Sequence, residues 1–177
     1  MLHDRLKVID DHKNVFQRQQ SIKEPTMPLP SLNGQRVAII GGSPGTGYAV
    51  VECALGEGAQ VVIGSSNAAN VEAALVRLGQ GASGGVVAVR DEASVATFFE
   101  LLRAFAHLVF TAGDWGPHLL ASPIAQMDFG SASEAMMKIR FWGALMAIKH
   151  AQGRISANGS FTLSDGVLAH KPRKGAP

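Results

Sequence analysis

The sequence predicts an α/β fold in which a doubly wound parallel sheet of about five strands carries helices on both faces. Three observations predict it. Short apolar runs recur along the chain, stretches with helical spacing separate these runs, and a glycine-rich turn follows the first run. The runs are continuous rather than alternating, which strands covered on both faces require. The chain has 177 residues, 46% of them hydrophobic, which is enough for one such domain.

Strands are predicted where five apolar runs stand, at 36–41, 60–64, 86–90, 107–111 and 160–164. The first run leads through the glycine-rich turn into a helix at 47–58, and the residues 79–85 before the third run are predicted as a turn. The alternation of strands and helices implies right-handed crossovers, and the sheet is therefore expected to be Rossmann-like.

Three further helices are predicted from their caps and apolar spacing. Asn67 is a candidate N-cap for the helix that ends near Leu78, and Asp91 for the helix that ends near Leu102. Ser131 and Glu134 form a capping box that opens a long helix at 131–152.

Residues 1–30 differ in composition from the rest of the chain. They are rich in charged and amide side chains, and they end in Pro25, Pro28 and Pro30. Their apolar face is thin, so we predict a flexible N-terminal extension followed by a folded domain at 31–177. Met27 would also serve as a start of the folded part.

Composition excludes several classes of protein and site. A single cysteine excludes a disulfide scaffold, and six histidines without ligand spacing predict no metal site. The 16 basic and 14 acidic residues are nearly balanced, so no nucleic-acid partner is predicted. The chain has no apolar run long enough for a membrane span, and its start lacks the apolar core of a signal peptide. We therefore expect a cytoplasmic protein.

The turn after the first strand has the sequence Gly-Gly-Ser-Pro-Gly-Thr-Gly at 41–47. Glycines at such a turn allow the backbone to approach a diphosphate, and the N–H groups that open the next helix bind it. The candidate nucleotide-binding residues here are Gly41, Ser43, Gly45, Thr46 and Gly47.

The spacing Gly-x-x-x-Gly-x-Gly resembles the motif Thr-Gly-x-x-x-Gly-x-Gly of the short-chain dehydrogenase/reductase family, with Ile40 in the Thr position. Phe-Thr-Ala-Gly at 110–113 resembles that family's Asn-Asn-Ala-Gly, with both asparagines replaced. Arg-Phe-Trp-Gly at 140–143 is similar to its Asn-x-x-Gly helix. The resemblance covers about 32–177, and it implies that Val89, Ala112 and Gly113 also flank the cofactor, although Ala88 stands where the family usually has Asp.

The choice of cofactor depends on charge at the end of the second strand. An NAD enzyme usually has a carboxylate there, whereas this chain has Ser65, Ser66 and Asn67 after Gly64. A 2′-phosphate is not repelled and the hydroxyls can donate to it, so we expect NADP(H) rather than NAD(H). No Arg or Lys stands in this stretch or in the glycine turn. The alternative is that the two serines only cap the loop.

The resemblance implies hydride transfer between a nicotinamide and the carbonyl or alcohol group of an unknown small molecule. In the family a Tyr-x-x-x-Lys pair supplies the proton, and a Ser and an Asn hold substrate and water. Here Arg140 stands in the Asn position, and Asp165 stands in the Ser position with Ser164 one residue before it. The only tyrosine is Tyr48, with Glu52 at the Lys spacing, and the family's Tyr would fall at or just past Pro177.

Three explanations remain open for this pattern. The chain is a truncated dehydrogenase that lacks the C-terminal side of the sheet, a non-catalytic nucleotide-binding or scaffolding relative, or an enzyme that uses Asp165, Ser164 or Arg140 in another reaction. The resemblance also implies a homodimer through the helix at 131–152.

Overall fold

The computed structural model describes residues 31–43, 45–113, 126, 128, 130 and 133–164. The chain divides into two units, and the described sheet lies in the second, Leu32–Pro177. The predicted extension at 1–30 lies outside the described residues. Among the helices that are described, none combines the length and the apolar character that crossing a membrane requires.

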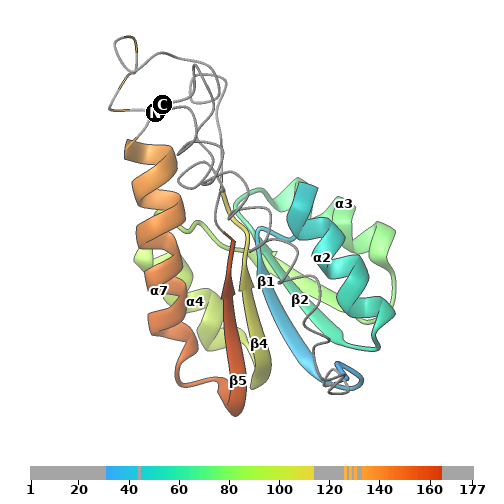
Figure 1. Cartoon of the computed structure of the whole chain (residues 1–177). Coiled ribbons are helices and arrows are strands. Elements are labelled where there is room, and N and C mark those ends of the chain that lie inside the picture. Colours follow the sequence, from blue (N-terminus) through green and yellow to red (C-terminus); the bar gives the residue numbers. More distant parts are fainter. Residues whose placement is uncertain are drawn as a thin grey trace, which may run out of the picture. The chain divides into compact units, whose positions relative to one another are not determined.

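The described strands form one parallel sheet in the order β3-β2-β1-β4-β5 (Figure 1). The predicted doubly wound sheet is therefore confirmed, and it is open, with β3 and β5 at its edges. The strands are β1 (Arg36–Ile40), β2 (Gln60–Ser65), β3 (Ala82–Val86), β4 (Phe105–Phe110) and β5 (Ile155–Leu163).

Helices cover both faces of this sheet, α2 (Gly45–Gly56) and α3 (Ala68–Leu78) on one face and α4 (Glu92–Leu101) and α7 (Gly143–Ala151) on the other (Figure 1). The side chains of β1 alternate between the faces. Val37 and Ile39 pack in the cluster that contains Val51 of α2. Ala38 and Ile40 pack with the α4 and α7 side chains. Burial on both faces explains why β1 is a continuous apolar run.

Two predicted N-caps are confirmed. The Asn67 side chain accepts a hydrogen bond from the backbone N–H of Asn70 at 3.1 Å, and α3 begins at the next residue. The Asp91 side chain accepts from the N–H of Ala93 at 3.0 Å and begins α4. Each cap satisfies one of the N–H groups that a helix start leaves without an intrahelical partner.

The prediction for the third strand was wrong in position. The structure places β3 at Ala82–Val86, so that four of its five residues lie in the stretch 79–85 predicted as a turn and only Val86 lies in the predicted strand at 86–90. β3 pairs with β2 from Val61↔Ala82 to Ser65↔Val86. Val87 and Val89 lie beyond the strand and are buried in the cluster under α4 and α7. The apolar run at 86–90 therefore indicates buried side chains, whereas the strand consists of the residues whose backbone pairs with β2.

The long helix predicted at 131–152 is also different in the structure. Residues Ser133–Trp142 form a π-helix, η2, and only Gly143–Ala151 is α-helical. A Cβ at Gly143 would lie 3.0 Å from the Val89 carbonyl oxygen and 3.3 Å from that of Lys138. A glycine thus allows this helix to approach the segment after β3. Ser131 of the predicted capping box lies outside the described residues.

The two remaining strands differ from prediction only in their bounds. β4 begins two residues earlier than predicted, at Phe105, and β5 extends from Ile155 instead of starting at 160. The pairing of β4 with β5 shifts register between Phe105 and His107. The strand therefore includes residues 155–159 (Ile-Ser-Ala-Asn-Gly), which form no continuous apolar run.

An ion-pair cluster joins α4 to α7. Glu92, in the first turn of α4, accepts hydrogen bonds from Lys149 and from His150 Nε2 at 3.0 Å in the last turn of α7. The Lys149 hydrogen bond, followed by that of His150, lowers the pKa of the Glu92 carboxyl. The pairing therefore favours the folded state above the ordinary Glu pKa, and this contribution is lost as the pH falls through the lowered value.

Candidate nucleotide-binding site

The candidate site lies at the carboxyl ends of β1, β2 and β4. In a parallel sheet these ends share one edge, and ligands bind where the strand order reverses. The order β3-β2-β1-β4-β5 places that reversal between β1 and β4. Gly41 follows β1 and Thr111 follows β4 at this point, where the Thr111 N–H and hydroxyl both donate to the Ile40 carbonyl, at 2.8 and 3.1 Å.

Gly41 and Gly47 allow the turn, the helix and β4 to pack closely. Gly41 has φ +93°, and a Cβ there would lie 2.6 Å from the Ala112 nitrogen. A Cβ at Gly47 would lie 2.1 Å from the Gly41 oxygen and 2.5 Å from Thr111 Oγ1. All three distances are shorter than a side chain tolerates, so the absence of a Cβ at Gly41 and Gly47 allows α2 to pack against β1 and β4.

Gly45 is different, because its surroundings are open. It has φ +66°, and within the described part of the chain no heavy atom lies within 4 Å of the position a Cβ would take. Gly45 and Thr46 are exposed at the start of α2, whose first turn carries no acidic side chain. The start of a helix presents N–H groups and partial positive charge, and a diphosphate can approach it here.

A hydroxyl pair links the glycine turn to the end of β2. Ser43 is buried, with 7% of its surface exposed, and its Oγ donates to Ser65 Oγ at 2.8 Å. A hydroxyl both accepts and donates, so Ser65 retains its own O–H for another acceptor. Ser66, next in the chain, is exposed. The structure therefore brings together two residues, Ser43 and Ser65, that the sequence analysis placed in the same site from separate segments.

The side-chain oxygen of Asn67 caps α3, and no carboxylate stands between Gly64 and Asn67. The alternative that the two serines only cap the loop does not describe Ser65, whose hydroxyl accepts a hydrogen bond from Ser43 of the glycine turn, and Ser66 is exposed. The residues present fit a ligand with negative charge at this end of β2.

Ala112 and Gly113 lie after β4, on the other side of the glycine turn. Ala112 contacts Gly41, as described above, and a Cβ at Gly113 would lie 2.5 Å from the Arg140 guanidinium. Arg140 belongs to η2 and is half-buried. Its positive charge therefore lies at the same edge of the sheet as the glycine turn.

Val89 and the catalytic candidates Ser164 and Asp165 differ in how far the structure describes their positions. Val89 is buried in the α4 and α7 cluster, with 8% of its surface exposed. Ser164 follows β5, and its N–H donates to the Phe110 carbonyl at 3.1 Å, so it lies at the same edge of the sheet. Asp165 lies outside the described residues.

Tyr48 does not belong to this edge. Its ring is buried among α2 and α3 side chains, and the Arg77 guanidinium carbon lies 4.4 Å from the ring centroid. This placement supports the view that Tyr48 is a poor proton donor. Among the described residues, no group of three or more metal-ligating side chains occurs.

Two features of the site were missed by the sequence analysis. The Ser43–Ser65 hydrogen bond joins residues 22 positions apart, and no local pattern indicates it. The Thr111 hydroxyl donates to the Ile40 carbonyl, and it also lies beside Gly47, where a side chain would meet it. The sequence did offer a signal for Thr111, because it belongs to Phe-Thr-Ala-Gly at the end of a predicted strand.

Comparisons with known proteins agree with this geometry. No family model matches the sequence. The chain is 33% identical over 166 residues to the short-chain dehydrogenase/reductase ucsE of an Acremonium species, covering 83% of this chain and 61% of that protein. The chain thus spans about three fifths of the length of this curated relative.

Solved structures show the same likeness. The MalC reductase/Diels-Alderase of Malbranchea aurantiaca is 25% identical, with a TM-score of 0.69, over 82% of this chain and 61% of its own. An NADPH-bound short-chain oxidoreductase of Pseudomonas aeruginosa PAO1, with an atypical catalytic centre, has a TM-score of 0.71 at 24% identity, over 80% of this chain and 58% of its own. At 24% identity, the similarity to the Pseudomonas protein shows a shared fold.

Proposed function

Over the residues that it covers, this chain belongs to the short-chain dehydrogenase/reductase family, and we therefore propose that it binds NADP(H) for an oxidoreductase reaction. In this proposal hydride passes between the cofactor and a carbonyl or alcohol group of a small molecule. The observation that carries it is the glycine turn, where Gly41 and Gly47 pack tightly and Gly45 opens onto free space. The NADPH-bound Pseudomonas protein of the same fold supports the choice of a nicotinamide cofactor.

When bound, the cofactor supplies a hydride. The glycine turn and the start of α2 would hold the diphosphate, and the hydroxyls of Ser65 and Ser66 would bind the 2′-phosphate of NADP(H). Val89, Ala112 and Gly113 would flank the nucleotide. Arg140 and Ser164, at the ends of η2 and β5, would face the substrate together with Asp165.

A second candidate function is nucleotide binding without catalysis. Arg140 in place of an Asn favours it, as does the burial of Tyr48 away from the sheet edge. The two candidates share the nucleotide site and differ in whether a proton donor reaches the substrate. A cytoplasmic location of the protein stays a prediction.

NADPH binding is the direct test of the proposal. The purified chain should change NADPH fluorescence on titration and gain thermal stability with the cofactor, because a ligand that binds only the folded state stabilises it. Oxidation of NADPH with a panel of ketones and aldehydes then separates the two candidates. Absence of any binding at millimolar NADPH would contradict both.

Ser66→Asp should reverse the cofactor preference. A carboxylate at the end of β2 repels a 2′-phosphate and accepts hydrogen bonds from ribose hydroxyls. We expect the Kd of NADPH to rise by about tenfold or more, corresponding to about 1.4 kcal/mol, while NADH binding is kept or improved. Gln80→Glu makes the same change of charge beyond the other end of α3 and should alter neither Kd. Equal losses for both cofactors would contradict the assignment.

We also propose that the chain forms a homodimer through η2 and α7, which lie in the segment 131–152 predicted as one helix. Phe141 and Trp142 are 49% and 53% exposed, and their rings lie 5.0 Å apart in an edge-to-face arrangement. Leu145 of α7 is also exposed, at 44%. Large apolar side chains exposed together are typical of an interface.

Trp142→Glu should therefore weaken self-association in sedimentation experiments, with the circular dichroism spectrum unchanged. Val76→Glu, which replaces another exposed apolar residue on α3, is the control and should leave the association unchanged. A native chain that stays monomeric at high micromolar concentration would refute the dimer.

A further inference from the structure

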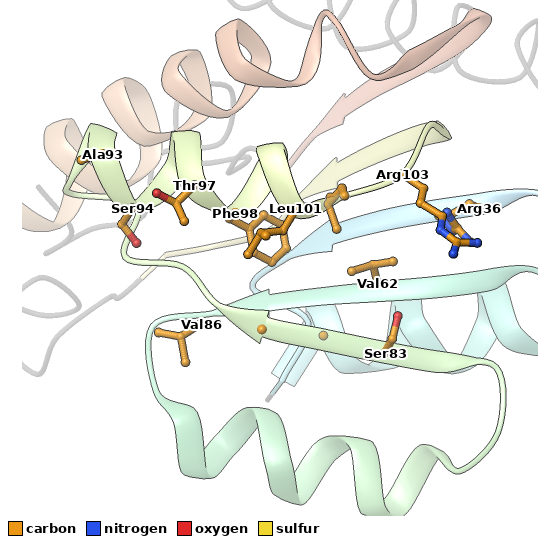
Figure 2. A pocket seen from close by; sticks show the side chains of 13 residues that line it. Arg36, Val62, Ser83, Val86, Ala93, Ser94, Thr97, Phe98, Leu101 and Arg103 are labelled. Atoms are coloured by element: carbon orange, nitrogen blue, oxygen red, sulfur yellow. The ribbon is translucent and has the colours of Figure 1, made fainter.

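A cavity of about 640 Å³ lies between α4 and the adjacent surface of β2 and β3, on the face opposite α2 and α3 (Figure 2). None of the residues that line it belongs to the glycine turn or to the end of β4. The cavity is therefore separate from the proposed nucleotide site. Its volume lies within the range of about 300–1,000 Å³ that small-molecule sites occupy.

The two adjacent glycines of β3 face opposite sides of the sheet, and only Gly85 faces the side of α4. Gly84 permits close pairing with β2, because a Cβ there would lie 2.5 Å from Ile63 Cγ1. At Gly85 a Cβ would meet only the Phe98 ring, at 3.8 Å, so this position leaves space rather than avoiding a clash. The missing side chain of Gly85 leaves a slot between β3 and α4.

The walls of this slot carry apolar side chains together with the hydroxyls of Ser83, Ser94 and Thr97. The Ser83 hydroxyl donates to the Val61 carbonyl, and the Ser94 hydroxyl accepts from the Ala88 N–H. Val62 and Phe98 line it from the sheet and from α4, and Leu101 and Val86 line it with 81% and 51% of their surfaces exposed. In Figure 2, Phe98 and Leu101 lie on the side of α4 that faces β2 and β3. Covering such apolar surface with a ligand is favourable, by about 25 cal/mol per Å².

One end of the slot carries positive charge. Arg36, at the start of β1, and Arg103, just after α4, both line the cavity and are drawn at the same end of it (Figure 2). The Arg36 guanidinium donates to the neutral Gln60 side chain at 3.3 Å, and none of the lining residues is acidic. Two guanidinium groups at one end of an apolar slot complement a carboxylate, which arginine binds through paired N–H donors.

We propose that this cavity binds a small amphipathic carboxylate. Its carboxylate group lies between Arg36 and Arg103, and its apolar body extends along Val62 and Gly85 beneath Phe98 and Leu101. This site is independent of the nucleotide site, and it would be present whether or not the chain binds NADP(H).

The test compares octanoate with octanol, which has the same chain length but no charge. Octanoate should bind in calorimetry and shift the amide resonances of Thr97 and Phe98. The double variant Arg36→Gln/Arg103→Gln should weaken octanoate binding at least tenfold and leave octanol binding unchanged. Gly85→Leu should abolish the binding of both compounds, because its side chain fills the slot. Arg77→Gln, on α3 at the opposite face, removes one positive charge elsewhere and should have no effect.

Three results would overturn the proposal. They are the absence of octanoate binding at millimolar concentration, shifts confined to the exposed residues of η2 and α7, and native affinity in the double variant. Circular dichroism of each variant shows whether the sheet and helices are intact. Because NADPH binding is measured separately, failure of this site and failure of the nucleotide site are distinguishable.

Discussion

Gly45→Trp is expected to abolish NADPH binding and leave the fold intact. Gly45 is exposed at the start of α2, and among the described residues no heavy atom lies within 4 Å of its Cβ position, so the Cβ of a side chain there meets no protein atom. The indole ring would instead fill the space that a diphosphate needs to reach the helix N–H groups. We expect the Kd of NADPH to rise by about 100-fold or more, corresponding to about 2.8 kcal/mol.

Gly79→Trp is the matched control for this variant. Gly79 follows α3 with φ +68°, close to the +66° of Gly45, and it is equally open. Both substitutions place a side chain on a backbone with positive φ, which costs about 1–3 kcal/mol, but only one lies at the proposed site. If Gly45→Trp bound NADPH as tightly as Gly79→Trp does, the glycine turn would not be the diphosphate site.

Gly47→Ala is expected to destabilise the fold itself. Its Cβ would lie 2.1 Å from the Gly41 oxygen and 2.5 Å from Thr111 Oγ1, so α2 must move away from β1 and β4. Overpacking of this kind costs about 3 kcal/mol, which corresponds to a fall in Tm of about 6–12 °C. Thermal unfolding followed by circular dichroism measures this change.

Gly56→Ala is the control in the same helix, because a Cβ there meets no heavy atom within 4 Å. It should leave the Tm unchanged or raise it slightly, since alanine is the better helix former. An unchanged Tm for Gly47→Ala would mean that α2 does not pack against the glycine turn as described. The Gly45→Trp variant thus tests nucleotide binding, and the Gly47→Ala variant tests the stability of the fold around the same turn.

The order of elements could be predicted because each depends on a local pattern. Asn67 and Asp91 cap helices through N–H groups two or three residues away, so their signals lie within single turns. The run at 37–40 marks β1 because both faces of that strand are buried. The glycine turn could also be predicted, since it joins this strand directly to its helix.

The bounds of β3 could not be predicted in the same way. Hydrophobicity reports burial, and Val87 and Val89 are buried without belonging to the strand. The residues that do pair with β2 include Gly84 and Gly85, whose composition is typical of a turn. Their partner is about twenty residues away in sequence, and the pairing depends on backbone groups that every residue has.

Sequence alone was therefore enough for the parallel sheet, the glycine turn and the absence of a carboxylate after β2. Tertiary structure was needed for the Ser43–Ser65 hydrogen bond, for Arg140 beside Gly113, and for the cavity between β3 and α4. The first group follows from residues that are neighbours along the chain. The second depends on how strands and helices pack, which brings together side chains far apart in sequence and leaves space where side chains are missing.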